Sequence, residues 1–117
     1  MILLVDDQAD VRFMLSLFLD DEGMDFEEAA SGEEAIEKLR SRSYDLVLLD
    51  QRMPPGMSGI DVAEHMRRGD AGTPIVLYSA FLDPTVEERA GELGLRTVDK
   101  GEPDRLIEAI RATLSPA

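Results

Sequence analysis

The stretch LVLLDQRMPPGMSG, residues 46–59, decides the fold class. Four apolar residues, 46–49, run without alternation into Asp50, and two prolines and two glycines follow within the next nine positions. A short continuous apolar run bounded by breakers is typical of a parallel strand covered on both faces. An isolated carboxylate at the end of a buried strand would lose hydration without compensation. Asp50 therefore either caps the next turn at a wet edge of the sheet or belongs to a site that uses its charge.

Similar apolar runs alternate with helix-period segments five times along the 117 residues. The predicted strands are residues 2–5, 24–29, 46–49, 74–79 and 95–98, and the predicted helices are residues 10–20, 31–42, 60–68, 83–93 and a last one beginning near 103. Repeated βα units predict an α/β fold with an open, doubly wound, five-stranded parallel sheet and helices on both faces. A chain of this length is expected to form one domain, residues 1–117.

Composition excludes several classes of function. The chain has no cysteine, which excludes disulfides and thiolate metal sites. No apolar run approaches the ~20 residues that span a bilayer, and the opening MILLVDD lacks the features of a signal peptide, so we expect a cytoplasmic protein. A net charge of -13 predicts no direct binding to nucleic acid or to an anionic membrane surface.

The ends of the predicted strands collect polar side chains. Asp6 and Asp7 follow the first strand, Asp50 the third, Ser79 ends the fourth, and Lys100 follows the fifth. Ligands of doubly wound sheets lie beyond these carboxyl ends. Clustered carboxylates repel one another unless a cation joins them, and an all-oxygen cluster suits Mg²⁺, for which Mn²⁺ could substitute. A helix cap could explain one such aspartate, but not the whole set.

The chain resembles the receiver domains of two-component response regulators along nearly its whole length. The resemblance is carried by the acidic pair in LLVDD, the segment LLDQRMP around Asp50, the pair Ser79-Ala80, and Lys100. It implies a flavodoxin-like (βα)5 fold in which Asp50 accepts a phosphoryl group. Asp7 and Asp50 would then bind Mg²⁺ directly, Asp6 mainly through water, and Arg52 through its backbone carbonyl.

The resemblance also implies roles for partners and for further residues. A sensor histidine kinase or a histidine phosphotransfer protein would supply the phosphoryl group, and an unknown output domain or protein would read the changed surface. The domain itself would catalyse only its own phosphorylation and dephosphorylation. Lys100 would neutralise phosphoryl charge, and the Ser79 hydroxyl would bind a phosphoryl oxygen. Arg52, Ala80 and Phe81 are expected to tune the switch or the attacking water.

Four features depart from the family pattern. The loop MPPGMSG is one residue longer than the common form, Ser79 replaces the commoner threonine, and two further positions bear on the switch. Thr97 stands where an aromatic switch residue is common, three positions before Lys100, and Gly101 stands where a proline often follows that lysine. These departures question the usual aromatic signal but not phosphorylation. Tyr78 and Phe81 flank Ser79 and are alternative aromatic candidates.

The first predicted helix carries more apolar surface than one buried face requires. The side expected to face the sheet comprises Val11, Leu15, Phe18 and Leu19. Phe13, Met14 and Leu17 fall elsewhere on the helix. Either they pack against a neighbouring loop or, with Asp10, they dock the phosphodonor, as this helix does in the family.

Other readings stay open at this stage. A haloacid dehalogenase-type aspartyl-phosphate phosphatase also uses an Asp nucleophile and Mg²⁺, but it expects a second Asp where this chain has Arg52. A phosphorylation-independent receiver-like interaction module is a second alternative. A histidine phosphotransfer protein built on His65 is a third, but we expect His65 to be an ordinary exposed histidine on a surface helix. No output domain is recognisable, so either a stand-alone regulator or an excised receiver fits, and a homodimer is possible.

Overall fold

A computed structural model describes residues 1–69, 72–80 and 82–114. Its elements are β1 (Ile2–Val5), α1 (Ala9–Asp21), β2 (Phe26–Ala29), α2 (Gly32–Ser41), β3 (Leu46–Leu49), α3 (Gly59–Gly69), β4 (Ile75–Ser79), α4 (Pro84–Glu92), β5 (Arg96–Asp99) and α5 (Pro103–Leu114). The five strands form one parallel sheet in the order β2-β1-β3-β4-β5. The predicted doubly wound sheet is confirmed.

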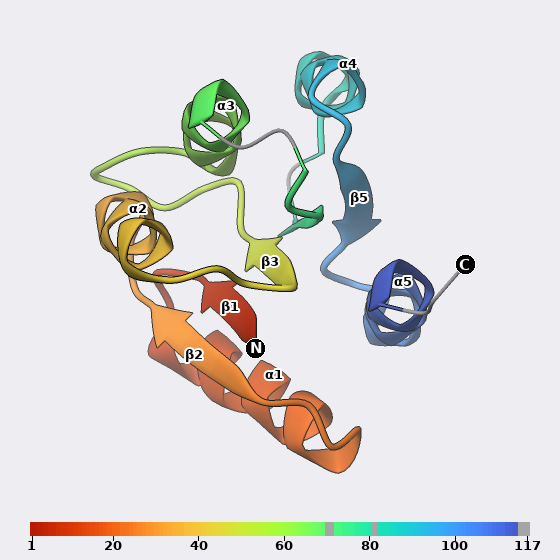
Figure 1. The fold of residues 1–117 in the computed structure, drawn as a ribbon. Coiled ribbons are helices and arrows are strands. Elements are labelled where there is room, and N and C mark those ends of the chain that lie inside the picture. Colours follow the sequence, from red (N-terminus) through yellow and green to blue (C-terminus); the bar gives the residue numbers. More distant parts are fainter. Residues whose placement is uncertain (70–71, 81, 115–117) are drawn as a thin grey trace.

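Helices cover both faces of the sheet, and Figure 1 shows α1 and α5 on one side and α2, α3 and α4 on the other. Two apolar clusters result. Leu15 and Leu19 of α1 pack with Leu106 and Ile110 of α5 against one face. The opposite face packs against buried apolar side chains of α2, α3 and α4, among them Ile36 of α2. The continuous apolar run of β3 is buried because it lies in the centre of the sheet and contributes to both clusters.

Local signals in the sequence explain where two helices begin. The hydroxyl of Ser31 accepts a hydrogen bond from the Glu34 amide at 3.0 Å and so caps α2. The Glu34 carboxylate reaches back and accepts a hydrogen bond from the amide of Ala30, the residue before the cap, at 3.2 Å. Asp83 caps α4 by accepting from the Val86 amide at 2.9 Å. The predicted starts of both helices are confirmed.

The second strand is shorter than predicted. It begins at Phe26 rather than at residue 24, because the amide of Met24 donates to the carbonyl of Leu19 at 2.9 Å and so still belongs to the end of α1. Gly23 provides the left-handed conformation for this turn, with φ of 71°. β2 lies at an edge of the sheet. Among the described residues, no helix is long and apolar enough to cross a bilayer.

Candidate functional site

Three aspartates lie together where the central strands end. β1 and β3 pair in register with Val5 beside Leu49, so Asp6 and Asp50 emerge next to each other. One carboxylate oxygen from each of Asp6, Asp7 and Asp50 can be chosen so that all three lie within 4.8 Å of one another. Asp6 and Asp50 are only 1% and 4% exposed, whereas Asp7 is exposed. The predicted acidic cluster is therefore present, with two buried members and one that faces solvent.

Lys100 brings a positive charge to this cluster from the end of β5. Its ammonium nitrogen lies 3.0 Å from Asp6 Oδ2 and donates a hydrogen bond to Asp50 Oδ2 at 3.2 Å. The backbone is held as well, since the Lys100 amide donates to the Ser79 carbonyl at 3.0 Å. The Lys100 ammonium also lies 5.6 Å from the centre of the Tyr78 ring, within the range of a cation–π contact.

Burial and the neighbouring charges shift two pKa values in the site. Burial raises the pKa of Asp50, and the carboxylate of Asp6 raises it further, while Lys100 partly opposes both effects. For Lys100, burial lowers the pKa, but Asp6 and Asp50 outweigh burial and raise it overall. Lys100 is thus held as a cation, whereas the charge on Asp50 is costly in this environment.

The loop after Asp50 is tied down at both ends. Met53 is buried, and the Pro54–Pro55 peptide bond is cis. At the loop's end, the Gly59 amide donates to the Gln51 carbonyl at 2.9 Å. A side chain at Gly59 would collide with the carbonyl oxygen of Asp50. Because only a glycine fits there, α3 begins directly against the strand end that carries Asp50.

A cavity of about 310 Å³ opens above the aspartates. Its walls are formed by Asp7, Gln8, Asp50, Arg52, Pro54, Ser79, Ala80 and Lys100. Most of the side chains predicted for catalysis, metal binding and tuning therefore border one space, with Asp6 buried beneath it. The structure does not describe Phe81, so the role predicted for it lies outside the described residues.

The donor set at the cavity fits a divalent cation. Three carboxylates against the one ammonium of Lys100 leave a net charge of -2 (-3 + 1) within this group. Asp6 Oδ2 is buried, and its contact within the described residues is the ion pair with the Lys100 ammonium at 3.0 Å. A buried oxygen in this state is a ready ligand for a cation or for a water bound to one.

The aromatic candidates for a switch are less well placed. Tyr78 is only 3% exposed and packs in the cluster formed by α1 and α5, so it cannot act as an exposed rotameric signal in this conformation. Thr97 is half-buried in β5. Gly101 lies in the turn after β5, where its amide donates to Asp99 Oδ1 at 2.7 Å. A threonine and a glycine thus stand at the two departing positions that bear on the aromatic switch.

The predicted docking residues lie on the outside of α1. Phe13, Met14 and Leu17, which we call the α1 patch, are 64%, 42% and 54% exposed and are the large hydrophobic side chains most exposed to solvent among the described residues. Packing against a neighbouring loop, the alternative considered above, would have left them less exposed. Asp10 is exposed at the start of the same helix.

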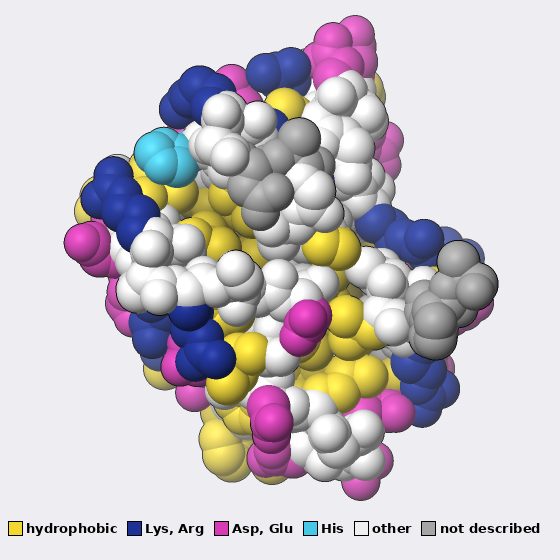
Figure 2. Space-filling model, viewed as in Figure 1, with side chains coloured by type: hydrophobic (Ala, Val, Ile, Leu, Met, Phe, Trp, Pro, Cys, Tyr) yellow, Lys and Arg dark blue, Asp and Glu magenta, His cyan; other side chains and the backbone are white. Residues whose placement is uncertain are grey.

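His65 does not border the acidic cavity, and it is half-buried rather than openly exposed as predicted. It borders a groove of about 240 Å³ between α2 and α3, with Ile36, Leu39 and Met66 among the apolar lining. Figure 2 shows apolar surface beside the cyan histidine. Its setting on an α/β sheet excludes the four-helix arrangement of a phosphotransfer protein.

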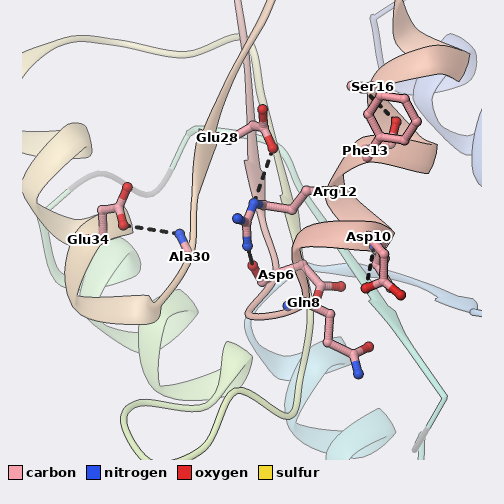
Figure 3. Close-up of polar contacts among 10 residues, drawn as sticks. Asp6, Gln8, Asp10, Arg12, Phe13, Ser16, Glu28, Ala30 and Glu34 are labelled. Carbon is pink, nitrogen blue, oxygen red and sulfur yellow. Dashed lines mark hydrogen bonds and ion pairs between the residues drawn. The ribbon is translucent and has the colours of Figure 1, made fainter.

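Arg12 is a residue of the site that the sequence did not reveal. Its guanidinium donates to the carbonyl oxygen of Asp6, just after β1, at 2.6 Å and to Glu28 Oε1, in β2, at 3.1 Å (Figure 3). One signal was available, since a cation near the start of a helix opposes the helix dipole and so needs a partner. The sequence also did not reveal the backbone amide of Gln8, which donates to Asp6 Oδ1 at 2.9 Å.

Comparison with known proteins agrees with this geometry. Residues 2–111 match the family described as the response regulator receiver domain. The transcriptional regulatory protein ResD of Bacillus subtilis is 44% identical over 79 residues, which cover 68% of this chain and 32% of ResD. The DNA-binding response regulator MtrA of Mycobacterium tuberculosis is 37% identical over 118 residues, covering 97% of this chain and 50% of MtrA. The chain thus spans half or less of the length of these two relatives.

Solved structures give the same match in three dimensions. The response regulator protein TrrA of Thermotoga maritima, solved in complex with Mg²⁺-BeF, superimposes with a TM-score of 0.86 at 34% sequence identity. The match covers 97% of each chain. The likeness therefore extends over the whole sheet and its five helices.

Proposed function

This chain belongs to the response regulator receiver domain family, and we propose that Asp50 is its phosphoacceptor in two-component signalling. The observation that carries the proposal is the position of Asp50 at the cavity. Its carboxylate is buried, hydrogen-bonded to Lys100 and clustered with Asp6 and Asp7. Such an arrangement holds a nucleophile rigidly. It also surrounds the nucleophile with an ammonium and with carboxylates that can bind a cation, and both can neutralise phosphoryl charge.

The chemistry is a phosphoryl transfer. A carboxylate oxygen of Asp50 forms a bond to phosphorus while the bond from phosphorus to the donor's leaving atom breaks, and that atom keeps the electron pair and takes up a proton. The Lys100 ammonium, already 3.2 Å from Asp50 Oδ2, pairs with the incoming phosphoryl oxygens. The Ser79 hydroxyl, from the end of the neighbouring strand, donates to another of these oxygens.

The carboxylates of Asp7 and Asp50 would hold the metal directly, with the backbone carbonyl of Arg52, and Asp6 would act mainly through water. The fit of the donor set and the Mg²⁺-BeF complex of TrrA support Mg²⁺ as the ion, with Mn²⁺ as a substitute. When bound, the ion neutralises charge on the transferring group. The chain's own residues supply the nucleophile, its orientation and the ammonium that completes the neutralisation.

The proposal is tested with a small phosphodonor. Incubation with acetyl phosphate and Mg²⁺ should add the mass of one phosphoryl group, measured on the intact protein. The adduct should be labile to hydroxylamine, as an acyl phosphate is, and chelation of Mg²⁺ should prevent its formation. No gain in mass, or a gain unaffected by the chelator, would contradict the proposal.

Phosphorylation changes the surface through Ser79 and the loop that follows it. In the phosphorylated state the Ser79 hydroxyl draws Ala80 towards the phosphoryl group, and the population shifts towards a second packing of α4 and β5. Thr97 is half-buried in β5 and therefore belongs to the part of the domain that would repack. Without an aromatic side chain at this position, the signal is carried by the backbone and by the packing of Thr97.

The partners follow from the family and from the α1 patch. Receiver domains interact with histidine kinases or histidine phosphotransfer proteins, and the α1 patch with Asp10 is the docking surface for one of these donors. Relatives such as ResD and MtrA carry names of transcriptional or DNA-binding regulators, so a regulator of this kind is a candidate output. Residues 1–117 act as one receiver domain in the cytoplasm, as a monomer or homodimer, without binding nucleic acid or membrane themselves.

Arg52 should govern how long the phosphorylated state persists. It borders the cavity two residues after Asp50, where a guanidinium can pair with phosphoryl oxygens but cannot orient an attacking water as an amide can. We expect Arg52→Asn to speed self-dephosphorylation about fivefold, since one such contact contributes about 1 kcal/mol. The measurement is decay of the intact-mass signal after removal of the donor. Arg40→Asn, on exposed α2 surface, is the control, and equal decay in both variants would refute the role of Arg52.

A further inference from the structure

Arg12 is a long cationic side chain that is used inside the protein rather than at its surface. It projects from the first turns of α1, and its side chain is 16% exposed. Its two contacts lie on different strands, the carbonyl of Asp6 at the end of β1 and the carboxylate of Glu28 in β2 (Figure 3). One guanidinium fork thus joins α1, β1 and β2 at the rim that carries the acidic cluster.

The carbonyl that Arg12 binds sets the orientation of the next residue. The Asp6 carbonyl and the Asp7 amide belong to one planar peptide unit, so fixing the carbonyl fixes the direction from which the chain enters Asp7. The other groups of Asp6 are held separately. Its amide donates to Ala29 at 3.2 Å, its Oδ1 accepts from Gln8, and its Oδ2 pairs with Lys100. Asp7 itself is exposed.

The placement of Arg12 carries an electrostatic cost that packing alone does not explain. A cation near the start of α1 opposes the helix dipole, and its burial removes hydration. Glu28 offsets both costs and holds the fork in the direction of the Asp6 carbonyl. An apolar side chain would fill the same space without these electrostatic costs. The contribution that is particular to the guanidinium is therefore its hydrogen bond to the Asp6 carbonyl.

Resting on the proposed function, we propose that Arg12 is a positioning residue of the metal site, with Glu28 as the partner that orients it. Arg12 contacts neither the metal nor the phosphoryl group. It fixes the Asp6–Asp7 peptide so that Asp7 presents its carboxylate to the ion together with Asp50. Supporting residues of this kind typically change metal affinity 10- to 100-fold when they are removed.

The direction in which Mg²⁺ affinity changes distinguishes a positioning role of Arg12 from a purely electrostatic one. Removing a nearby cation would, by electrostatics alone, tighten the binding of a divalent ion to an acidic cluster. Loss of a positioning contact would weaken binding instead. Arg12→Met should therefore lower Mg²⁺ affinity about tenfold, and Arg12→Lys, which keeps the charge but loses the planar fork, should lower it by a smaller factor.

The test is calorimetric titration of the unphosphorylated full chain with Mg²⁺, at a temperature at which circular dichroism shows each variant to be folded. The matched control is Arg67→Met. Arg67 is also an arginine that binds backbone carbonyls, those of Leu93 at 2.8 Å and Thr73 at 2.7 Å, but away from the acidic cavity. The Arg67→Met variant should have a lower free energy of unfolding than the parent, but its Mg²⁺ affinity should stay within about twofold of the parent's.

The Mg²⁺ affinities of the parent and the variants either support or overturn the positioning role of Arg12. Weaker binding in the Arg12 variants and unchanged binding in Arg67→Met support the proposal, and Arg12→Lys carries the test should Arg12→Met fail to fold. Binding within twofold of the parent, or tighter, in the Arg12 variants would overturn the positioning role and leave the proposed function standing. A parent protein that binds no Mg²⁺ would overturn the proposed function and this inference with it.

Discussion

Asp50→Asn should leave the protein unable to gain a phosphoryl group from acetyl phosphate and Mg²⁺. The amide that replaces the carboxylate has nearly the same shape but is not a competent nucleophile at phosphorus. We expect no phosphorylated species in the intact-mass spectrum under conditions in which the parent is substantially converted. Asp21→Asn removes an exposed carboxylate at the end of α1 and should be phosphorylated like the parent.

Loss of the fold would not account for this result. Because burial and Asp6 raise the pKa of Asp50, the ionised form costs stability, and this cost grows as the pH rises through the folded-state pKa. At neutral pH Asp50→Asn removes that cost, so its free energy of unfolding without metal should equal or exceed that of the parent. A stable Asp50→Asn protein that still forms a hydroxylamine-labile adduct at the parent's rate would show that another residue is the acceptor.

The sequence predicted the position of the site better than its internal geometry. Asp6, Asp50 and Ser79 follow apolar runs, and parallel strands end at a common edge, so their meeting at one cavity follows from topology. Capping residues such as Ser31 and Asp83 are also local signals, which explains why the starts of α2 and α4 were predicted correctly.

The features that were missed depend on contacts between distant segments. Arg12 reaches Glu28, sixteen residues away, only because α1 packs beside the edge strand β2. His65 was expected to be exposed, but its burial depends on how α2 lies against α3. Tyr78 lies in an apolar strand that buries side chains on both faces, so the strand pattern gave no indication of which face would take it. Such contacts have no signature within one segment.

Leu17→Glu should slow phosphorylation by a histidine kinase or phosphotransfer protein while leaving phosphorylation by acetyl phosphate unchanged. Leu17 belongs to the α1 patch, whose exposed apolar surface is large for a solvated helix. A buried charge in the centre of a docking interface costs about 2 kcal/mol or more, which corresponds to a transfer rate at limiting donor roughly 30-fold lower. The measurement is the rate of phosphoryl transfer from a kinase that phosphorylates the parent.

Two comparisons separate docking from other causes. Ala112→Glu adds the same charge to an exposed position of α5, so it should transfer at the parent's rate if net charge is not responsible. Because acetyl phosphate needs no docking surface, equal slowing with both donors would indicate a distorted acidic site and would refute the docking role. The α1 patch and the acidic site are joined through Arg12, which adjoins Phe13 and binds the Asp6 carbonyl. A selective effect on the protein donor would therefore show that partner recognition uses the α1 patch and that phosphoryl transfer uses the separate acidic cavity at the strand ends.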